Sequence, residues 1–239
     1  MNSLLVADSF LVANGTVRGL DLHRHRFTTS CKALGFEGAG DYWDDHVTRL
    51  PGFGRWFPRF ELWSDGLTDD GRRLALQARP APPQGGRVRV AVHEEPDPRT
   101  SPRVKGPDLE MLGALKAEAA ATQHADEILL LDADGTVLEA AYSAVVWWED
   151  DTLCTPPADR PLLPSVTVAL LRDLATTRGI ESAERSRTPA DLMDREVWLL
   201  NALHGIRPIH AWNDGPIDPL PASHSTDWQH ALLALSHPL

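Results

Sequence analysis

The stretch DEILLLDADGTVLEAAYSAVVWW, residues 126–148, decides the fold of this chain. Its apolar run over 127–131 predicts a buried strand, and the DADG sequence at 132–135 predicts a turn into a second strand over 136–139. A third strand is expected over 145–148, where Trp147 and Trp148 straddle the strand and one ring enters the core. The C-terminal part of the chain is therefore expected to contain a sheet.

Further elements follow this stretch and precede it. The sequence VTVALLRDLATTRG, residues 166–179, has apolar residues at helical spacing; Ser165 would begin this helix and Gly179 would end it. Other helices are expected over 109–121 and, in the tail TDWQHALLALS, over 226–236. Further strands are expected over 153–155, 196–201 and 206–212.

The N-terminal part predicts a smaller antiparallel unit. Asn14 and Gly15 predict a tight turn between two strands, and Asp21 is expected to cap the next helix. The expected strands cover 4–12, 17–20, 55–63, 73–79 and 87–93, and the expected helix covers 21–34. The stretch EEPDPRTSPRVKGP, residues 94–107, is proline-rich and suits a connector. We therefore expect an N-terminal domain over 1–98, a connector over 99–106 and a C-terminal domain over 107–239.

Composition excludes several classes of function. The 239 residues carry a formal net charge of -11, with arginines scattered among acids, so nucleic-acid binding is not expected. Cys31 and Cys154 belong to no ligand motif, so neither a disulfide framework nor a metal site is expected, and a cytoplasmic location fits. No apolar run approaches a membrane span. Small molecules and a second copy of the chain are the expected partners.

Lysine is rare in this chain, because Lys32, Lys105 and Lys116 are the three among 23 basic residues. Lys105 stands in RVKGPDLEML, residues 103–112, where a loop becomes a helix. A lysine desolvated at such a junction has a lowered pKa and can act as a nucleophile or Schiff-base partner, which arginine cannot. The position alone also fits a solvated surface lysine, which is our interpretation of Lys32 and Lys116.

Several motifs, taken in chain order, give Lys105 a context. They are HRHRF at 23–27, Lys105 itself, the stretch 126–148, TP at 155–156, LLPSVTVALLRDLA at 162–175 and LLNALHGIRPI at 199–209. This series resembles the class IV aminotransferases, the pyridoxal-phosphate (PLP) enzymes of fold type IV. The resemblance implies a mixed α/β chain, with a small N-terminal α+β domain and a larger β-barrel-like domain with helices. It also implies PLP as the cofactor and a homodimer.

The resemblance also assigns roles to residues. Lys105 would form the Schiff base with the cofactor, and Glu139 would keep the pyridine nitrogen protonated. A phosphate would sit at the helix start after Pro164, where free N–H groups and the helix dipole favour anions. The implied cofactor-binding residues are Arg26, Glu139, Ser143, Ser165, Val166, Thr167 and Asn201, and the candidates for the substrate side are Ser9, Arg103 and His204.

Each of these roles has a structural alternative. Glu139 could be a solvent-facing charge at a strand end, Ser165 an ordinary helix cap and Asn201 a turn residue. Arg26 could belong to an exposed basic turn of helix. The chain also departs from the family pattern. Ala144, Ser165 and Val168 replace the usual Asn, Gly and Arg, no tyrosine occurs over 106–111, and the opening family segment is reduced to residues 7–10.

Three functions remain open. The segment NALHGIRPI, residues 201–209, is most similar to aminodeoxychorismate lyases. A 4-amino-4-deoxychorismate lyase that forms 4-aminobenzoate and pyruvate is therefore the first expectation. The alternative is a PLP-dependent transaminase of the branched-chain or D-amino-acid type. A third reading is a degenerate member of the family that lost catalysis and acts as a binding protein.

Overall fold

The computed structural model describes residues 2–64, 71–213 and 224–239. Its contacts divide the chain into two compact units, each described by itself below. Unit 1 comprises residues 1–83, 103–109 and 235–239, and unit 2 comprises residues 84–102 and 110–234.

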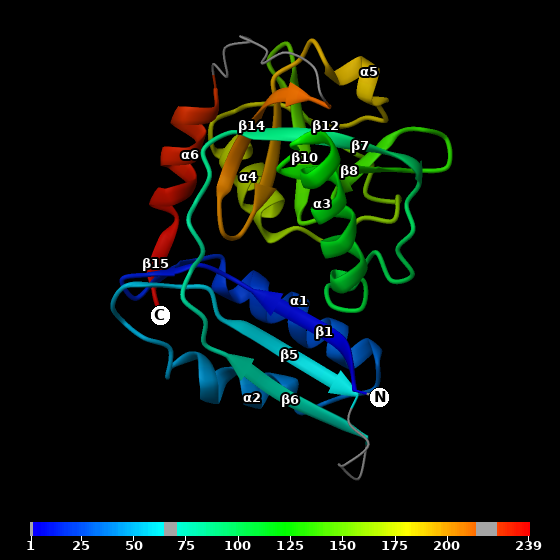
Figure 1. Ribbon diagram of the computed structural model, residues 1–239. Helices are drawn as coiled ribbons and strands as arrows, with labels where there is room; N and C mark the ends of the chain where they lie inside the picture. Colours follow the sequence, from blue (N-terminus) through cyan, green and yellow to red (C-terminus); the bar gives the residue numbers. More distant parts are fainter. Residues whose placement is uncertain (1, 65–70, 214–223) are drawn as a thin grey trace. The chain divides into compact units, whose positions relative to one another are not determined.

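Unit 1 is an α+β unit with two small sheets. The first sheet is antiparallel with the order β1-β5-β6, and the second has the order β15-β3-β2-β4. Two helices pack against the first sheet (Figure 1). The strands are β1 (Ser3–Ser9), β2 (Val12–Ala13), β3 (Thr16–Arg18), β4 (Arg55–Trp56), β5 (Arg59–Ser64), β6 (Arg72–Gln77) and β15 (Ser236–Pro238), and the helices are α1 (Leu20–Ala33) and α2 (Ala39–Val47).

The core of unit 1 follows from the alternation of β5. Phe60 and Leu62 are fully buried and pack with Phe27 of α1 and Trp43 of α2. The Trp43 and Phe60 rings stack 4.1 Å apart. Because successive residues of a strand point to opposite faces, the residues between them lie on the other face of the sheet, away from both helices.

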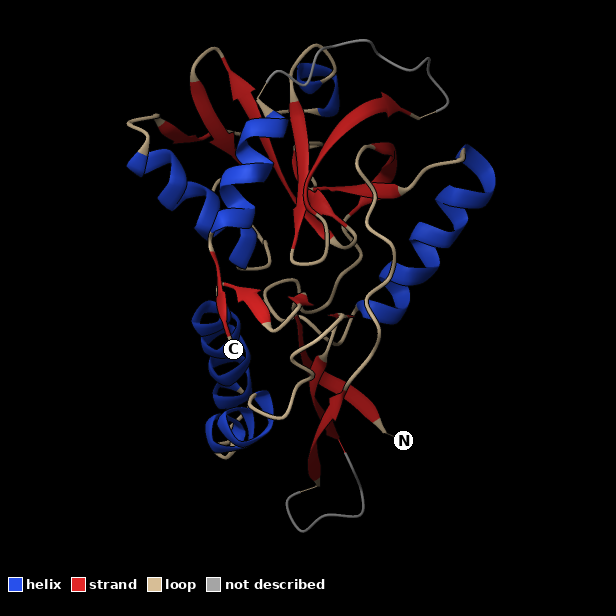
Figure 2. Ribbon diagram, turned by 90° about the vertical axis from the view of Figure 1, so that its left-hand side faces the viewer, coloured by secondary structure: helices blue, strands red, loops and turns tan. Residues whose placement is uncertain are grey.

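Unit 2 is a β-barrel with helices around it. The strand order is β12-β11-β10-β13-β14-β7-β8-β9, and β9 also pairs with β10, which closes six strands into a ring. The strands are β7 (Val88–Pro96), β8 (Glu127–Leu131), β9 (Val137–Ala140), β10 (Ser143–Glu149), β11 (Thr152–Thr155), β12 (Ser182–Glu184), β13 (Val197–Asn201) and β14 (Gly205–Trp212). The helices α3 (Leu109–Gln123), α4 (Val166–Thr177), α5 (Pro189–Leu192) and α6 (Ser225–Ala234) lie outside these strands (Figure 2). A small α+β unit and a larger barrel confirm the expected fold class.

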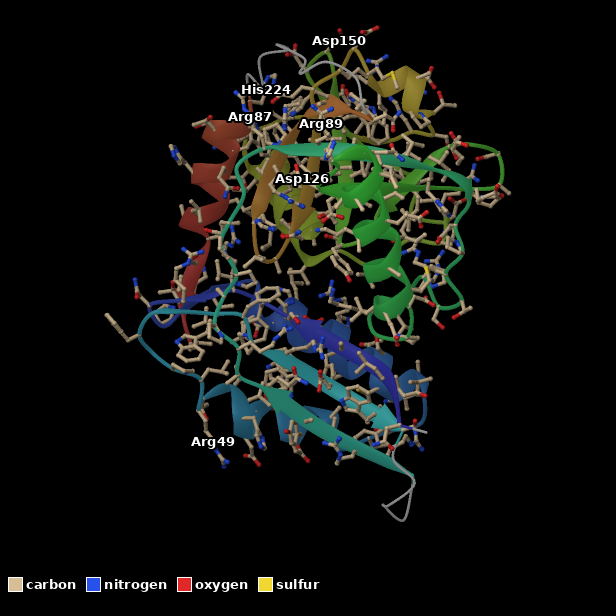
Figure 3. All side chains as sticks on the ribbon, in the orientation of Figure 1. Arg49, Arg87, Arg89, Asp126, Asp150 and His224 are labelled. Carbon is tan, nitrogen blue, oxygen red and sulfur yellow. The ribbon has the colours of Figure 1, made fainter. Side chains whose placement is uncertain are left out.

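Strand β7 corrects one expectation. The segment 87–93 was expected in the antiparallel N-terminal unit, but β7 pairs in parallel with both β14 and β8 in unit 2. Val88, Val90 and Ala91 are fully buried, as suits a strand with neighbours on both edges. Arg89 and Asp126 lie close together where β7 and β8 begin (Figure 3), and the Asp126 carboxylate accepts a hydrogen bond from the Arg89 backbone N–H at 2.8 Å.

The division of the chain also differs from the expected boundaries. The first change of unit comes at residue 84, before β7, whereas the prolines suggested a connector over 99–106. The segment 103–109, which contains Lys105, returns to unit 1, and so does the tail over 235–239. Within the described residues, no helix is long and apolar enough to cross a membrane.

Some helix and strand ends lie where the local sequence predicts them, and others do not. The Asn14–Gly15 turn is present with φ values of 50° and 73°. Helix α1, however, is capped by Gly19 in the left-handed conformation and not by Asp21, which lies in its first turn. The expected strand over 55–63 is interrupted before β5 at Pro58, which has no N–H to donate to a ladder.

Candidate functional site

Lys105 is held by the edge of β1 within unit 1. Its backbone carbonyl accepts a hydrogen bond from the Ala7 N–H at 2.6 Å. Gly106 follows with a φ of 146°, and a Cβ at this position would lie 2.9 Å from the Cα of Val6. Val104 packs against the core of unit 1, while Arg103 is exposed. The contacts of the main chain therefore fix where the Lys105 side chain starts.

Arg26 belongs to a buried charged group in the same unit. Asp8 on β1 is fully buried and accepts hydrogen bonds from His23 Nδ1 and Arg26 Nε, each at 2.7 Å. Burial opposes ionisation of Asp8, but the Arg26 charge and the His23 contacts outweigh it and lower its pKa to about 2. Burial also lowers the pKa of His23, and the Arg26 and Lys105 charges lower it further against the effect of Asp8.

The interpretation of HRHRF as an exposed basic turn is therefore wrong for two of its four basic residues. His23 is buried, and the Arg26 side chain is 11% exposed. Sequence reasoning missed Asp8, although an acid inside the apolar strand over 3–9 was a signal for a buried cation nearby.

Glu139 is a buried carboxylate of β9 in unit 2, not a solvent-facing charge. Glu139 is 5% exposed, and its Oε1 accepts hydrogen bonds from Arg99 Nη1 at 2.5 Å and from the Leu163 N–H at 2.9 Å. Burial raises the pKa of Glu139, whereas Arg99 and the Leu163 N–H favour the ionised form. Arg99 also contacts Asp97, and despite burial these acids raise the pKa of Arg99.

Sequence analysis missed Arg99. It lies in the proline-rich stretch, 40 residues before Glu139, and no local pattern links the two residues. A buried carboxylate needs a compensating cation. A cation beside Glu139 could therefore be anticipated, but the sequence does not show that this cation is Arg99.

The start of α4 offers two free backbone donors. Ser165 is the N-cap, and its Oγ accepts a hydrogen bond from the Val168 N–H at 3.3 Å. The N–H groups of Val166 and Thr167 have no partner among the described residues, as expected for the first turn of a helix. Both residues are buried. A helix start of this kind binds anions through its N–H groups and its dipole.

The loop before α4 connects this helix start to Glu139. The Leu163 N–H donates to Glu139, and the Pro161 carbonyl accepts a hydrogen bond from Arg99 Nη2 at 3.0 Å. In unit 2 the loop that leads into α4 is therefore anchored to the buried carboxylate of β9.

Asn201 and Ser143 meet at the ends of β13 and β10. Asn201 Nδ2 donates to Ser143 Oγ at 3.0 Å, and Asn201 Oδ1 accepts from the N–H groups of Leu203 and His204. These contacts support the reading of Asn201 as a turn residue. Ser143 is buried, and its Oγ also accepts a hydrogen bond from Arg207 Nη2 at 3.3 Å.

His204 and Lys116 lie beside these contacts of Asn201, Ser143 and Arg207. His204 Nδ1 accepts a hydrogen bond from the Gly85 N–H at 3.1 Å. Burial, together with the charges of Arg207 and Lys116, lowers the pKa of His204 to about 4. Lys116 was interpreted as a surface charge, but it pairs with the buried Glu127 at 3.1 Å and lies over the Tyr142 ring. Lys32 is exposed, as expected.

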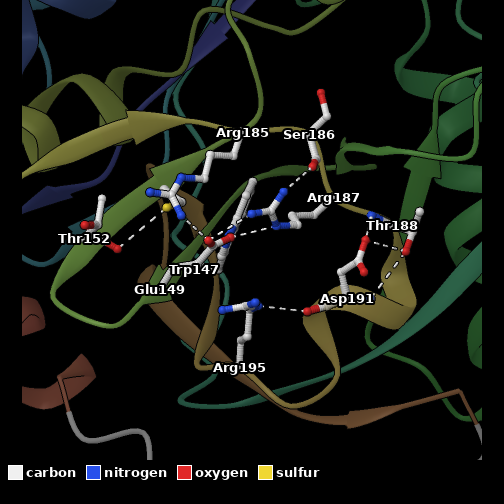
Figure 4. A network of polar contacts seen from close by, with 10 residues as sticks. Trp147, Glu149, Thr152, Arg185, Ser186, Arg187, Thr188, Asp191 and Arg195 are labelled. Carbon is white, nitrogen blue, oxygen red and sulfur yellow. Dashed lines mark hydrogen bonds and ion pairs between the residues drawn. The ribbon is translucent and has the colours of Figure 1, made fainter.

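A third buried carboxylate in unit 2, besides Glu139 and Glu127, has a structural role. Glu149 accepts hydrogen bonds from Arg187 and Trp147 and forms an ion pair with Arg185 (Figure 4). Burial opposes its ionisation, but these donors lower the pKa of Glu149 to about 2. The contacts tie the end of β10 to the segment that follows β12. No group of three metal-ligand side chains was found among the described residues.

Comparison with known proteins places this geometry in a family context. The model of the family described as amino-transferase class IV matches residues 5–212. A bifunctional aminodeoxychorismate lyase / D-amino acid transaminase of Mycobacterium tuberculosis is 31% identical over 99 residues. That match covers 38% of this chain and 34% of the relative, so it spans about a third of that protein.

Solved structures show the same fold at low identity. A putative 4-amino-4-deoxychorismate lyase from Legionella pneumophila superposes with a TM-score of 0.85 at 21% identity, covering 96% of this chain and 90% of that chain. A fold IV transaminase from Curtobacterium pusillum gives a TM-score of 0.80 at 23% identity, covering 96% and 86%.

Proposed function

The chain belongs to the class IV aminotransferase family, and we propose that within this family it is a 4-amino-4-deoxychorismate lyase. Membership makes it a PLP-dependent enzyme, either a lyase or a transaminase. The observation that carries the choice of lyase is the lyase-like segment over 201–209. The relative from Mycobacterium tuberculosis is compatible with this choice, because its name includes this activity.

The described residues fit the proposed cofactor. A buried carboxylate, Glu139, is the group that would hold a proton on a pyridine nitrogen, and Arg99 stabilises its ionised form. The free N–H groups of Val166 and Thr167 have the chemistry that a phosphate requires. Arg26 would add a charge-assisted contact, and Lys105 the amine for covalent attachment.

When bound, PLP supplies an electron sink for the carbon that bears the substrate amine. Lys105, in its neutral form, would take the proton from that ring carbon as a general base. Glu139 would keep the proton at the pyridine nitrogen, and the hydroxyl of Ser9 would assist protonation of the leaving group. Pyruvate leaves and the ring becomes aromatic as 4-aminobenzoate.

A transaminase remains the second candidate, because the name of the same relative also includes D-amino acid transaminase. The two reactions would use the same contacts to the cofactor. They differ in the need for a keto acid, since a transaminase returns the amino group to an acceptor and a lyase does not.

The first experiment adds PLP to the protein, records the visible spectrum, reduces with borohydride and maps the labelled peptide. We expect a yellow band and a label on Lys105, and neither in Lys105→Ala, with Lys32→Ala as the matched control that behaves as wild type. A label on Lys32 or Lys116, or no band at all, would favour the degenerate binding protein.

The second experiment separates the two enzymes. Release of 4-aminobenzoate from aminodeoxychorismate without any added keto acid is the expected result for the lyase. Complete dependence on a keto acid would support the transaminase instead.

We also propose a homodimer in the cytoplasm that takes part in 4-aminobenzoate synthesis. The free cysteines Cys31 and Cys154 support a reducing compartment. Sedimentation of the PLP-loaded protein tests the dimer, and a monomer at micromolar concentration would contradict it.

A further inference from the structure

Helix α4 is reached through a proline-rich loop over 156–165, which follows β11. Pro156, Pro157, Pro161 and Pro164 have no backbone N–H, so the loop has fewer donors for hydrogen bonds of its own. Its conformation therefore depends on contacts with neighbouring segments of unit 2.

Arg160 fastens the middle of this loop to the turn between β8 and β9. Its Nη1 pairs with Asp132 Oδ2 at 2.5 Å, and its Nη2 pairs with Asp134 Oδ2 at 2.9 Å. One planar guanidinium therefore bridges two carboxylates of a single turn. A lone ion pair at a surface contributes little to stability, but several charges joined in a network contribute more.

The turn that receives Arg160 has a well-defined backbone. Asp134 Oδ1 accepts hydrogen bonds from the Thr136 N–H at 3.1 Å and from the Thr136 hydroxyl at 2.6 Å. The Gly135 N–H donates to the Asp132 carbonyl at 2.9 Å, and Gly135 has a φ of 79°, which glycine adopts without strain. Both carboxylates are therefore presented to Arg160 from fixed positions.

The hairpin of β8 and β9 holds the loop at a further point, because β9 carries Glu139. The Leu163 N–H donates to Glu139 at 2.9 Å. The Pro161 carbonyl accepts a hydrogen bond from Arg99, which also pairs with Glu139. Helix α4 begins three residues after Leu163. The start of α4 is therefore tied to the hairpin that carries the buried carboxylate.

We propose that Arg160 is a positioning residue for the phosphate of the cofactor, which acts by fastening the loop over 156–165 to the turn over 132–135. It holds the free N–H groups at the start of α4 where an anion can bind them. It also keeps the start of α4 in register with Glu139, on the hairpin that receives Arg160. This inference rests on the proposed function, because it takes the start of α4 as the phosphate site.

The first test compares PLP with pyridoxal, which lacks the phosphate but has the same aldehyde and pyridine nitrogen. The binding of each is measured by the visible band that forms on Lys105. Arg160→Gln is expected to weaken PLP binding roughly 3- to 10-fold, as for the loss of two partly exposed ion pairs, and to leave pyridoxal binding unchanged. Arg178→Gln removes an ion pair at the opposite end of α4, so it is the matched control and should leave both affinities as in wild type.

The second test needs no covalent attachment. Inorganic phosphate is titrated into the isotope-labelled, PLP-free protein, and the amide chemical shifts of Val166 and Thr167 are followed by NMR. We expect phosphate to shift these amides at similar concentrations in wild type and Arg178→Gln, and at several-fold higher concentrations in Arg160→Gln. Asp134→Asn keeps a side-chain acceptor but loses the charge that pairs with Arg160, so it should change the titration in the same direction by a smaller factor.

Unchanged PLP binding in Arg160→Gln would overturn the proposal, and so would an equal loss of PLP and pyridoxal binding, which is the result of a general disturbance of the site. If Arg160→Gln does not fold, Asp134→Asn carries the same comparison. Failure of the wild-type protein to bind PLP on Lys105 would count against the proposed function. An unchanged ratio of PLP to pyridoxal affinity, in a protein that binds PLP, would count against the role of Arg160 alone.

Discussion

At the scale of single residues, we expect the loss of the buried ion pair Arg99–Glu139 to lower the stability of the protein strongly. Both side chains are almost fully buried, and Arg99 also neutralises Asp97. Removing one partner of a buried ion pair leaves an uncompensated charge, which typically costs about 3–5 kcal/mol. We expect Arg99→Gln to lower the free energy of unfolding by about this amount, measured by urea denaturation near neutral pH.

A double-mutant cycle tests whether the cost is the unpaired carboxylate. Arg99→Gln combined with Glu139→Gln should cost clearly less than the sum of the two single changes, because no Glu139 charge is then left unpaired. Arg178→Gln is the matched control. It removes an ion pair with Asp227, whose side chain is 74% exposed, and should cost about 0–1 kcal/mol. Additive single effects would show that Arg99 does not compensate Glu139.

Residue-level prediction worked where chemistry restricted the choice of amino acid. Lys105 was identifiable because only an amine forms a Schiff base, and Ser165 because short hydroxyl residues cap helices. The sequence marked Asp8 only as an acid inside an apolar strand, and it did not link Arg99 to Glu139. The partners of Asp8, and Glu139 as a partner of Arg99, lie 15 or more residues away, and only the fold brings them close. Whether Lys105 and Glu139 act on one cofactor stays a prediction.

At the scale of elements, the packing of the segment 103–109 against β1 depends on Gly106. Its φ of 146° is rarely adopted by L side chains, and a Cβ would lie 2.9 Å from the Cα of Val6 and 3.1 Å from the Leu5 carbonyl oxygen. A side chain here must therefore displace β1 or the segment that carries Lys105. We expect Gly106→Ala to destabilise the protein by more than 1 kcal/mol and to weaken the bond from Ala7 to Lys105.

Hydrogen exchange measures this effect directly at the Ala7 amide, which should lose protection in Gly106→Ala. Gly35→Ala is the matched control, because Gly35 also has a positive φ, of 73°, but open space around its missing Cβ. Gly35→Ala should show the conformational cost without loss of protection at Ala7. Unchanged exchange at Ala7 in both variants would contradict the proposed packing.

Element boundaries were predictable where turn chemistry is strict, as at Asn14–Gly15 and Gly179. Helix α2 was missed, although Ala39, Trp43 and Val47 recur at helical spacing within a polar segment and pack against the core of unit 1. Strand β7 was recognised as a strand but assigned to the wrong unit. Alternation reports burial, and it does not report which partner strand lies alongside.

At the scale of the whole molecule, the chain passes between its units four times. Segments 103–109 and 235–239 belong to unit 1, although unit 2 surrounds or precedes them in sequence. Helix α6 is followed after one residue by β15, which pairs with β3 in unit 1. Composition and proline content can indicate only where one continuous domain ends and the next begins. They could not predict units that are each built from several separate segments.

The pH dependence of stability sums over all groups of the molecule, and His204 contributes to its slope in mild acid. With a net charge of -11 at pH 7 and a sequence pI near 5.3, acidification toward pH 5.3 relieves self-repulsion. His204 acts in the opposite direction. Its folded pKa of about 4 lies below the ordinary histidine value of 6.5, so the unfolded chain binds a proton first as the pH falls.

The contribution of His204 is therefore complete above pH 6.5 and is lost between about pH 6.5 and 4, with an upper limit of ~3 kcal/mol that partial exposure reduces. His204→Asn keeps an acceptor for the Gly85 N–H but cannot titrate. We expect this variant to lose less stability than wild type between pH 6.5 and 4.5 in urea unfolding, whereas His25→Asn, at an exposed position of α1, should follow wild type. Parallel profiles for wild type and His204→Asn would show that burial and the charges of Arg207 and Lys116 do not hold His204 neutral in the folded protein.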